Sequence, residues 1–232
     1  MMNKKIIITG SSKGIGKYLS EYYINNGNIV FGCSRSNATI KHNNYTHFSL
    51  DISDEKSVKK MFNNLRKDHQ GLDVLINNAG IASMNHSILT KIETVHKILN
   101  TNIVGTFLFC REAIKLFHKS NNGRIINFST VAVPMNLEGE AIYAASKSAV
   151  VSLTKILSKE FSDYNVTVNA IGPTPIKTDL IKSVPEKKIN DLINKQAIKR
   201  FGNFDDIVNV LDFFINEKSS FITGQTIYLG GV

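Results

Sequence analysis

Short apolar runs alternate with longer segments of helical period along most of the chain. The short runs, such as the isoleucine-rich residues 4–9, are almost continuously apolar, as expected of strands buried on both faces. In the longer segments apolar positions recur three and four residues apart, which predicts helices. Strands are predicted at residues 4–9, 28–33, 45–50, 73–76, 124–128, 166–170 and 225–229. Helices are predicted at residues 15–26, 53–69, 91–118 with a break near Leu99 and Asn100, 142–161 and 205–216.

This alternation predicts an α/β protein with a parallel seven-stranded sheet that helices cover on both faces. Right-handed crossovers would place helices on both faces of the sheet and give a doubly wound fold, as in a Rossmann fold. The sequence has only four prolines, no internal repeat and no linker-like stretch. We therefore expect residues 1–232 to form a single domain.

Composition narrows the class of protein. A chain of 232 residues is long enough for one sizeable core, and its 42% apolar and 20% charged residues are ordinary for a globular domain. No apolar run approaches the roughly 18 to 20 residues that cross a bilayer, and residues 6–8 are too few for a signal-peptide core. We expect a cytoplasmic protein without membrane contacts. Cys33 and Cys110 lie far apart, and no Cys/His spacing of a metal site occurs, so no metal is predicted.

The formal net charge of +9 raises the question of an anionic partner. Lysines are spread along the whole chain, without a run of five basic residues or a basic patch interleaved with aromatics. This distribution favours a solvated surface over a nucleic-acid partner. The densest stretch, residues 177–200, has two interpretations: a solvated helix face, which is favoured, or cations that attract an anionic substrate.

A glycine-rich segment, TGSSKGIG at residues 9–16, separates the first predicted strand from the first predicted helix. Glycines at this place permit a tight turn and a close approach of the backbone to a diphosphate, which the helix N-terminus attracts. NAD-binding sites place an acid at the end of the second strand, whereas this chain has Ser34 and Arg35 there. Arg35 and Lys13 could pair with a 2′-phosphate, so the sequence predicts NADP(H) rather than NAD(H).

Tyr143 and Lys147 are four residues apart on a predicted helix and therefore share one face. A tyrosine with its ordinary pKa of about 10 is a poor base near neutrality, and a neighbouring ammonium would lower that pKa. The phenol could then exchange a proton with a carbonyl oxygen.

In this context the chain resembles the short-chain dehydrogenase/reductase family over nearly its whole length. The glycine-rich segment, the NNAG sequence at residues 77–80, Asn102, the Tyr143–Lys147 pair and the C-terminal residues 200–207 and 222–225 match the ordered motifs of that family. The resemblance implies a single-domain Rossmann fold, a nicotinamide cofactor, a small carbonyl or alcohol substrate, and a homodimer or homotetramer. It also implies a substrate lid around residues 174–200.

The resemblance further implies residue roles. Asn102 would hold a water that leads to Lys147, and Lys147 would bind the nicotinamide ribose and lower the pKa of Tyr143. The expected catalytic residues are Asn102, Thr130, Tyr143 and Lys147. The expected cofactor-binding residues are Gly10, Ser12, Lys13, Gly14, Ile15, Gly16, Ser34, Arg35, Asp51, Ile52, Asn78, Ala79, Gly80, Tyr143, Lys147, Pro173, Ile176 and Thr178.

Two positions depart from the family pattern. Thr130 stands where the family has a substrate-orienting serine, and its extra methyl stiffens the side chain and narrows the pocket. Ser129 or a water is the alternative source of that hydroxyl. Pro173 and Pro175 enclose Thr174 where the family has Pro-Gly, which predicts a stiffer loop.

The substrate stays open at the level of sequence. The pattern is most similar to that of β-ketoacyl-acyl-carrier-protein reductases, whose two carrier-docking arginines align with Asn121 and Tyr164 here. This difference weakens that assignment, and a keto-sugar or other small polar carbonyl is at least as well supported. A non-catalytic NADP(H)-sensing regulator is a third alternative, which the complete set of Asn102, Tyr143 and Lys147 disfavours.

Overall fold

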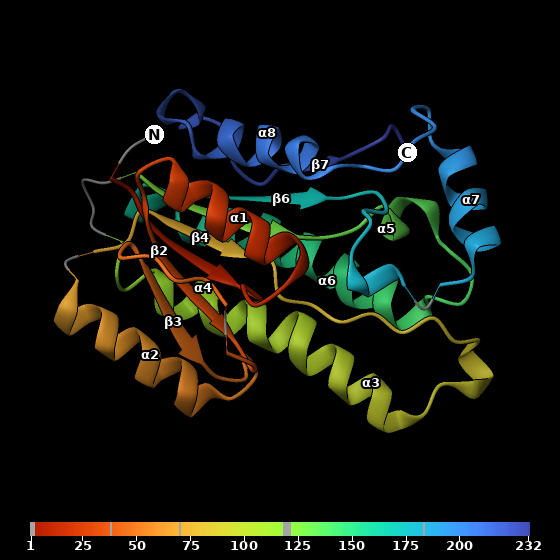
Figure 1. Cartoon of the computed structure of the whole chain (residues 1–232), viewed down its shortest axis with the longest axis horizontal. Coiled ribbons are helices and arrows are strands. Elements are labelled where there is room, and N and C mark those ends of the chain that lie inside the picture. The colour runs from red at the N-terminus through yellow and green to blue at the C-terminus, as the bar shows by residue number, and fades with distance from the viewer. Residues whose placement is uncertain (1–2, 38, 70, 118–121, 183) are drawn as a thin grey trace.

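The computed structural model describes residues 3–37, 39–69, 71–117, 122–182 and 184–232. Seven parallel strands form one sheet in the order β3-β2-β1-β4-β5-β6-β7 (Figure 1). The strands are β1 (Lys5–Thr9), β2 (Ile29–Ser34), β3 (Tyr45–Ser49), β4 (Val74–Asn77), β5 (Gly123–Phe128), β6 (Val166–Gly172) and β7 (Thr226–Tyr228). The predicted α/β fold is therefore confirmed, with strand ends within two residues of those expected from the sequence.

Helices cover both faces of the sheet. They are α1 (Gly14–Asn25), α2 (Glu55–Asp68), α3 (Ile92–Leu99), α4 (Thr106–Ala113), α5 (Ala132–Met135), α6 (Ala141–Glu160), α7 (Glu186–Lys195) and α8 (Phe204–Ile215). Helices α1 and α8 pack on one face, and α2, α4 and α6 pack on the other (Figure 1). Short 3-10 turns lie at Ser87–Leu89, Ser162–Tyr164, Asp179–Ile181 and Glu217–Ser219. Among the described residues, none of the helices has the length and apolar character needed to cross a membrane.

The apolar runs of the central strands supply both cores. In β1, Ile7 points into the core beneath α2 and α4, whereas Ile6 and Ile8 point into the core beneath α1 and α8. All three are at most 1% exposed. Burial of such a side chain contributes about 1.5–3 kcal/mol, so the unbroken IIIT sequence is what a two-faced strand requires.

The strand order reverses between β1 and β4. From β1 the chain proceeds outward to β2 and β3, and then returns to β4 and proceeds in the opposite direction to β7. Loops that leave the carboxyl ends of β1 and β4 therefore diverge and leave a crevice, which is where open α/β sheets bind ligands.

The helix predicted at residues 91–118 is divided into α3 and α4 by the six-residue π-helix Asn100–Gly105, at the predicted break. Residue 118 lies outside the described residues. The Thr106 hydroxyl donates to the Asn102 carbonyl at 2.8 Å within this segment. Helices α5 and α7, which were not expected from the sequence, both border the crevice.

Candidate active site

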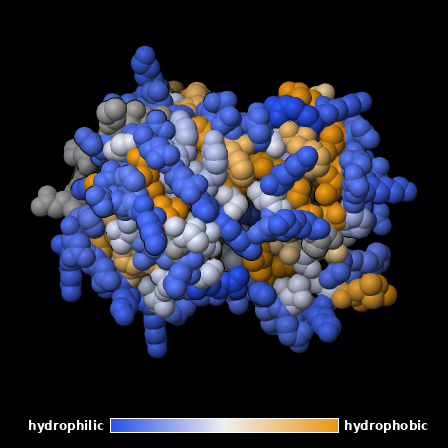
Figure 2. All heavy atoms as spheres, in the orientation of Figure 1, coloured by the Kyte–Doolittle hydropathy of each residue, from blue (hydrophilic) through white to orange (hydrophobic). Residues whose placement is uncertain are grey.

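A cavity of about 550 Å³ opens at the carboxyl ends of β1 and β4. On the face seen in Figure 2, hydrophobic residues gather near α5 and α7, and smaller groups of them lie elsewhere on a largely hydrophilic surface. Most of the residues expected to bind cofactor or substrate line this cavity. They are Gly10, Ser12, Lys13, Gly14, Ile15, Ser34, Arg35, Asp51, Ile52, Asn78, Ala79, Gly80, Thr130, Tyr143, Lys147, Pro173, Ile176 and Thr178. Gly16 and Asn102 are buried behind the wall instead.

The glycine-rich turn brings the backbone to the cavity. Gly10 has a φ of 72° and Gly14 a φ of 55°, which is the left-handed region that favours glycine. A Cβ on Gly16 would lie 2.2 Å from the Gly10 carbonyl oxygen, so the absence of a side chain at Gly16 allows α1 to pack against the turn. Helix α1 has no side-chain cap and no acid in its first turn. Its first amides are therefore suited to a diphosphate.

Arg35 and Lys13 line the same end of the cavity, and each is exposed with an acid nearby. Burial acts to raise the pKa of the Asp51 carboxyl, but the hydrogen bonds from Ser53, with a smaller contribution from the positive charge of Arg35, keep that pKa below its ordinary value. Lys13 lies 3.9 Å from Asp179 in the loop after β6. Both cations therefore border the cavity, with Lys13 in an ion pair with Asp179.

Asn78 and Ile52 shape the cavity through packing. The Asn78 side-chain amide donates to the Thr9 carbonyl at 2.9 Å, and the Ala79 amide donates to the Thr9 hydroxyl at 2.9 Å. These bonds join the ends of β1 and β4. Ile52 fills the space that a side chain on Gly105 would occupy, with its Cδ1 2.7 Å from that Cβ position.

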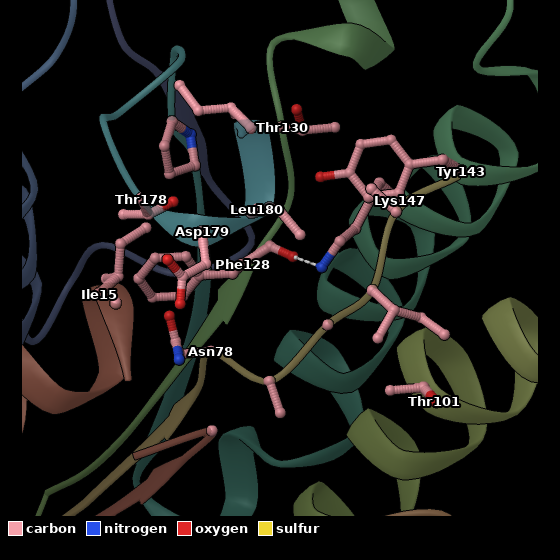
Figure 3. A pocket seen from close by; sticks show the side chains of 18 of the residues that line it. Ile15, Asn78, Thr101, Phe128, Thr130, Tyr143, Lys147, Thr178, Asp179 and Leu180 are labelled. Atoms are coloured by element: carbon pink, nitrogen blue, oxygen red, sulfur yellow. Dashed lines mark hydrogen bonds between the residues drawn. The ribbon is translucent and has the colours of Figure 1, made fainter. Parts of the chain in front are cut away.

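Tyr143 and Lys147 lie one turn apart on α6, and both face the cavity (Figure 3). They are 8% and 4% exposed. The Lys147 Nζ donates to the Phe128 carbonyl at the end of β5 at 2.7 Å, as the dashed line in Figure 3 marks. An ammonium has three donors, so two N–H groups of Lys147 remain for a ligand or water.

The pKa of Tyr143 differs from the lowered value that was expected from its position beside Lys147. Burial is the main cause that raises the pKa of Tyr143 to about 12; the Thr130 hydroxyl acts in the opposite direction, and the charge of Glu140 adds a smaller increase. Burial lowers the pKa of Lys147 to about 8. In this structure the low-dielectric surroundings outweigh any effect of Lys147 on the phenol, so the expected lowering of the Tyr143 pKa is not observed.

Thr130 lies beside the Tyr143 ring and borders the cavity (Figure 3). Its hydroxyl accepts from the Ala132 amide at 3.3 Å, and it lies close enough to the Tyr143 phenol to lower the phenol's pKa. The neighbouring Ser129 hydroxyl donates to the Lys147 carbonyl at 3.4 Å. Thr130, rather than Ser129, therefore presents its hydroxyl beside the phenol.

Asn102 occupies the π-helix and fixes the loop after β4. Its Oδ1 accepts from the Ile81 amide at 2.9 Å, and its Nδ2 donates to the Ile81 carbonyl at 3.0 Å and to the Ser146 hydroxyl at 2.9 Å. The Lys147 Nζ and the Asn102 Oδ1 lie 3.1 and 3.3 Å from the position of a Cβ on Gly80. One lone pair of Oδ1 remains, which a water near Lys147 could use.

Residues beyond the sequence expectation also line the cavity, including Leu137, Leu180, Leu192 and the carboxylic acid Glu140. Glu140 is the N-cap residue of α6 and is 6% exposed. The only signal in the sequence was its position three residues before Tyr143, which places both on one helix face. Within the described chain, no group of three His, Cys, Asp or Glu residues is arranged to hold a metal ion.

Two cations of the basic stretch at residues 177–200 are paired with acids. Lys182 forms an ion pair with Asp179 at 2.6 Å, and Arg200 with Asp206 at 2.7 Å. Lys188 differs, because its charge lowers the pKa of Glu140 in the cavity wall. Of the two carrier-docking positions, Tyr164 is 44% exposed and Asn121 lies outside the described residues.

Comparison with known proteins places this geometry in a family. The family model described as short chain dehydrogenase matches residues 4–189. A 3-oxoacyl-(acyl-carrier-protein) reductase of Rickettsia felis is 32% identical over 237 residues, covering 100% of this chain and 97% of that protein.

Two solved structures share the fold and are complexes with nicotinamide cofactors. A 4-hydroxyisoleucine dehydrogenase complexed with NADH has a TM-score of 0.91 at 29% identity, covering 99% of this chain and 98% of that chain. ElxO with NADP bound has a TM-score of 0.88 at 31% identity, covering 98% of this chain and 97% of that chain. The family match, the full-length relative and the arrangement of Tyr143 and Lys147 at the cavity agree, and the chain belongs to the short-chain dehydrogenase family.

Proposed function

We propose that this protein is an NADP(H)-dependent oxidoreductase that interconverts a small polar ketone and a secondary alcohol. The observation that carries the proposal is one continuous cavity. The glycine-rich turn and Arg35 lie at one end of it, and Tyr143, Thr130 and Lys147 lie at the other. Such a cavity holds an extended dinucleotide with its reactive end beside a proton donor.

The chain itself positions and protonates the substrate. The nicotinamide, when bound, supplies or accepts the hydride. Tyr143, whose pKa is raised to about 12, carries its proton at neutral pH and can donate it to a carbonyl oxygen. Thr130 orients that oxygen by a second hydrogen bond, and the free N–H groups of Lys147 hold ribose hydroxyls or a water.

The preference for NADP(H) is also proposed, and it rests on Arg35 at the end of β2. We expect Arg35→Ala to raise the KM for NADPH at least about tenfold, because charge-assisted bonds to a phosphate are lost. The KM for NADH should change less than about threefold. Steady-state kinetics with both cofactors measure this. Arg66→Ala on α2, where Arg66 contacts Asn63 at 2.9 Å, is the control. Equal changes for NADPH and NADH would contradict a 2′-phosphate contact.

A 3-oxoacyl-(acyl-carrier-protein) reductase is the second candidate, supported by the Rickettsia felis relative. The exposed Tyr164 in place of a carrier-docking arginine speaks against it. A screen of NADPH consumption over keto-sugars, simple ketones and β-ketoacyl thioesters separates the candidates. We expect the highest kcat/KM with small polar ketones, and a preference for carrier-bound thioesters would favour the second candidate.

The remaining expectations stay proposals. They are a homodimer or homotetramer, a cytoplasmic location, and a lid around residues 174–200, of which Ile176, Leu180, Ile181 and Leu192 border the cavity. A sensor without turnover is disfavoured, because it would not need a buried phenol and ammonium beside the cavity.

A further inference from the structure

Glu140 is a buried acid that neither the fold nor the proton exchange of Tyr143 uses. It is 6% exposed, and its side chain borders the cavity. Although it is the N-cap residue of α6, its side chain makes no capping hydrogen bond. Within the described parts of the chain, no hydrogen bond or ion pair to its carboxyl group is present.

Such a carboxyl group is costly unless something else satisfies it. Burying a polar group without a hydrogen bond costs several kcal/mol, and more when the group is charged. Burial accordingly raises the pKa of Glu140 to about 7, opposed by the charge of Lys188 on α7. The Glu140 oxygens are not among the fully enclosed unpaired atoms of the described residues, and Glu140 borders the cavity, which points to a ligand in the cavity as the partner that the protein does not supply.

The position of Glu140 fixes which part of a ligand it would meet. Glu140 immediately precedes α6 and Tyr143 is the third residue of that helix. Both border the same cavity, and the charge of Glu140 acts on the Tyr143 phenol. A substrate whose carbonyl oxygen reaches Tyr143 therefore places its neighbouring substituent toward Glu140.

Resting on the function proposed above, we propose that Glu140 accepts a hydrogen bond from a substrate hydroxyl next to the reacting carbon, and so selects hydroxylated ketones. An alkyl substituent would leave the carboxyl group desolvated and unpaired. An ammonium substituent would meet the positive charges of Lys147 and Lys188. A neutral hydroxyl donor fits both the protonated and the ionised carboxyl group.

Paired substrates of equal shape test this selection. Hydroxyacetone and butanone differ by one hydroxyl in place of a methyl, and so do 3-hydroxy-2-butanone and 3-methyl-2-butanone. The readout is the ratio of kcat/KM within each pair, because a ratio cancels a general loss of activity. Glu140→Leu removes the acceptor at similar size, Glu140→Gln keeps one acceptor, and Glu138→Gln changes an exposed acid two residues away as the control.

We expect Glu140→Leu to lower the ratio of kcat/KM for the hydroxylated ketone to kcat/KM for its alkyl partner at least about tenfold. Glu140→Gln should retain most of the ratio, and Glu138→Gln all of it. Should the Leu variant fail to fold, as judged by circular dichroism and NADPH binding, Glu140→Ala takes its place with the same expectation.

A ratio that Leu or Ala at residue 140 leaves unchanged while turnover persists would overturn the role of Glu140 and leave the oxidoreductase intact. Turnover by the wild-type protein only of ketones or thioesters without a neighbouring hydroxyl would also overturn the role of Glu140 and leave the oxidoreductase intact. If the wild-type protein reduces no carbonyl in either series or in the wider screen, the proposed function itself fails.

Discussion

Tyr143→Phe is expected to lower kcat by about 10²–10⁴-fold, the range that a positioned proton donor contributes. The substitution removes one oxygen and leaves the ring packed in its buried place on α6. Because the phenol is protonated at neutral pH, its loss leaves the developing alkoxide without its donor. NADPH should still bind, since the glycine-rich turn and Arg35 at the other end of the cavity are untouched.

Steady-state kinetics and NADPH fluorescence titration measure the two halves of this expectation separately. Tyr164→Phe, at the 44% exposed tyrosine beyond α6, is the matched control and should behave as wild type. Turnover that survives Tyr143→Phe within a factor of about three would refute the assigned role of the phenol.

Lys147→Met should lower kcat/KM by about 10²–10³-fold, comparable to the loss of one donor from a preorganised site. Its ammonium is anchored on the Phe128 carbonyl at 2.7 Å, with two donors left toward the cavity. Met has a similar length and no charge, so it fills the space without the donors.

The same substitution has an expected effect on stability that depends on pH. Burial lowers the folded-state pKa of Lys147 to about 8 from the ordinary 10.5. Below pH 8 the folded state carries a buried charge that Lys147→Met removes. Between pH 8 and 10.5 the unfolded wild-type chain holds a proton that the folded chain has released, so wild-type stability rises with pH there.

Denaturant unfolding of both proteins between pH 7 and 10 measures this difference. The advantage in unfolding free energy of Lys147→Met over wild type should shrink as the pH rises, because all other groups are shared. A difference that stays constant across this range would show that Lys147 keeps its ordinary pKa in the folded protein.

The fold could be predicted from the sequence because the spacing of apolar residues within each short segment distinguishes strands from helices. The unbroken apolar run of β1 predicts a strand that is buried on both faces. The apolar residues of α8 recur at helical spacing and predict its buried face. The break near Leu99 and Asn100 was predicted, whereas the π-helix was not. In the π-helix, Asn102 exchanges hydrogen bonds with the backbone of Ile81, which lies 21 positions earlier in the chain. A contact at this sequence separation cannot be recognised from local spacing.

The sequence motifs predicted residues that do line the cavity, whereas features that depend on tertiary structure were missed. Tyr143 and Lys147 follow from helical spacing, but their pKa values follow from burial, which the sequence does not record. The sequence gives no sign that Glu140 is buried; in the fold it borders the same cavity as the loop after β6 and Leu192 of α7.

The central claim is hydride transfer within this cavity, and deuterium tracing tests it most directly. NADPH labelled with deuterium on one or the other face of C4 of the nicotinamide would be incubated with the best ketone from the screen, and the alcohol analysed by mass spectrometry. A fixed cavity presents one face, so deuterium should appear on the carbinol carbon from one labelled cofactor and not from the other. Alcohol product that carries no deuterium from either cofactor would contradict the account.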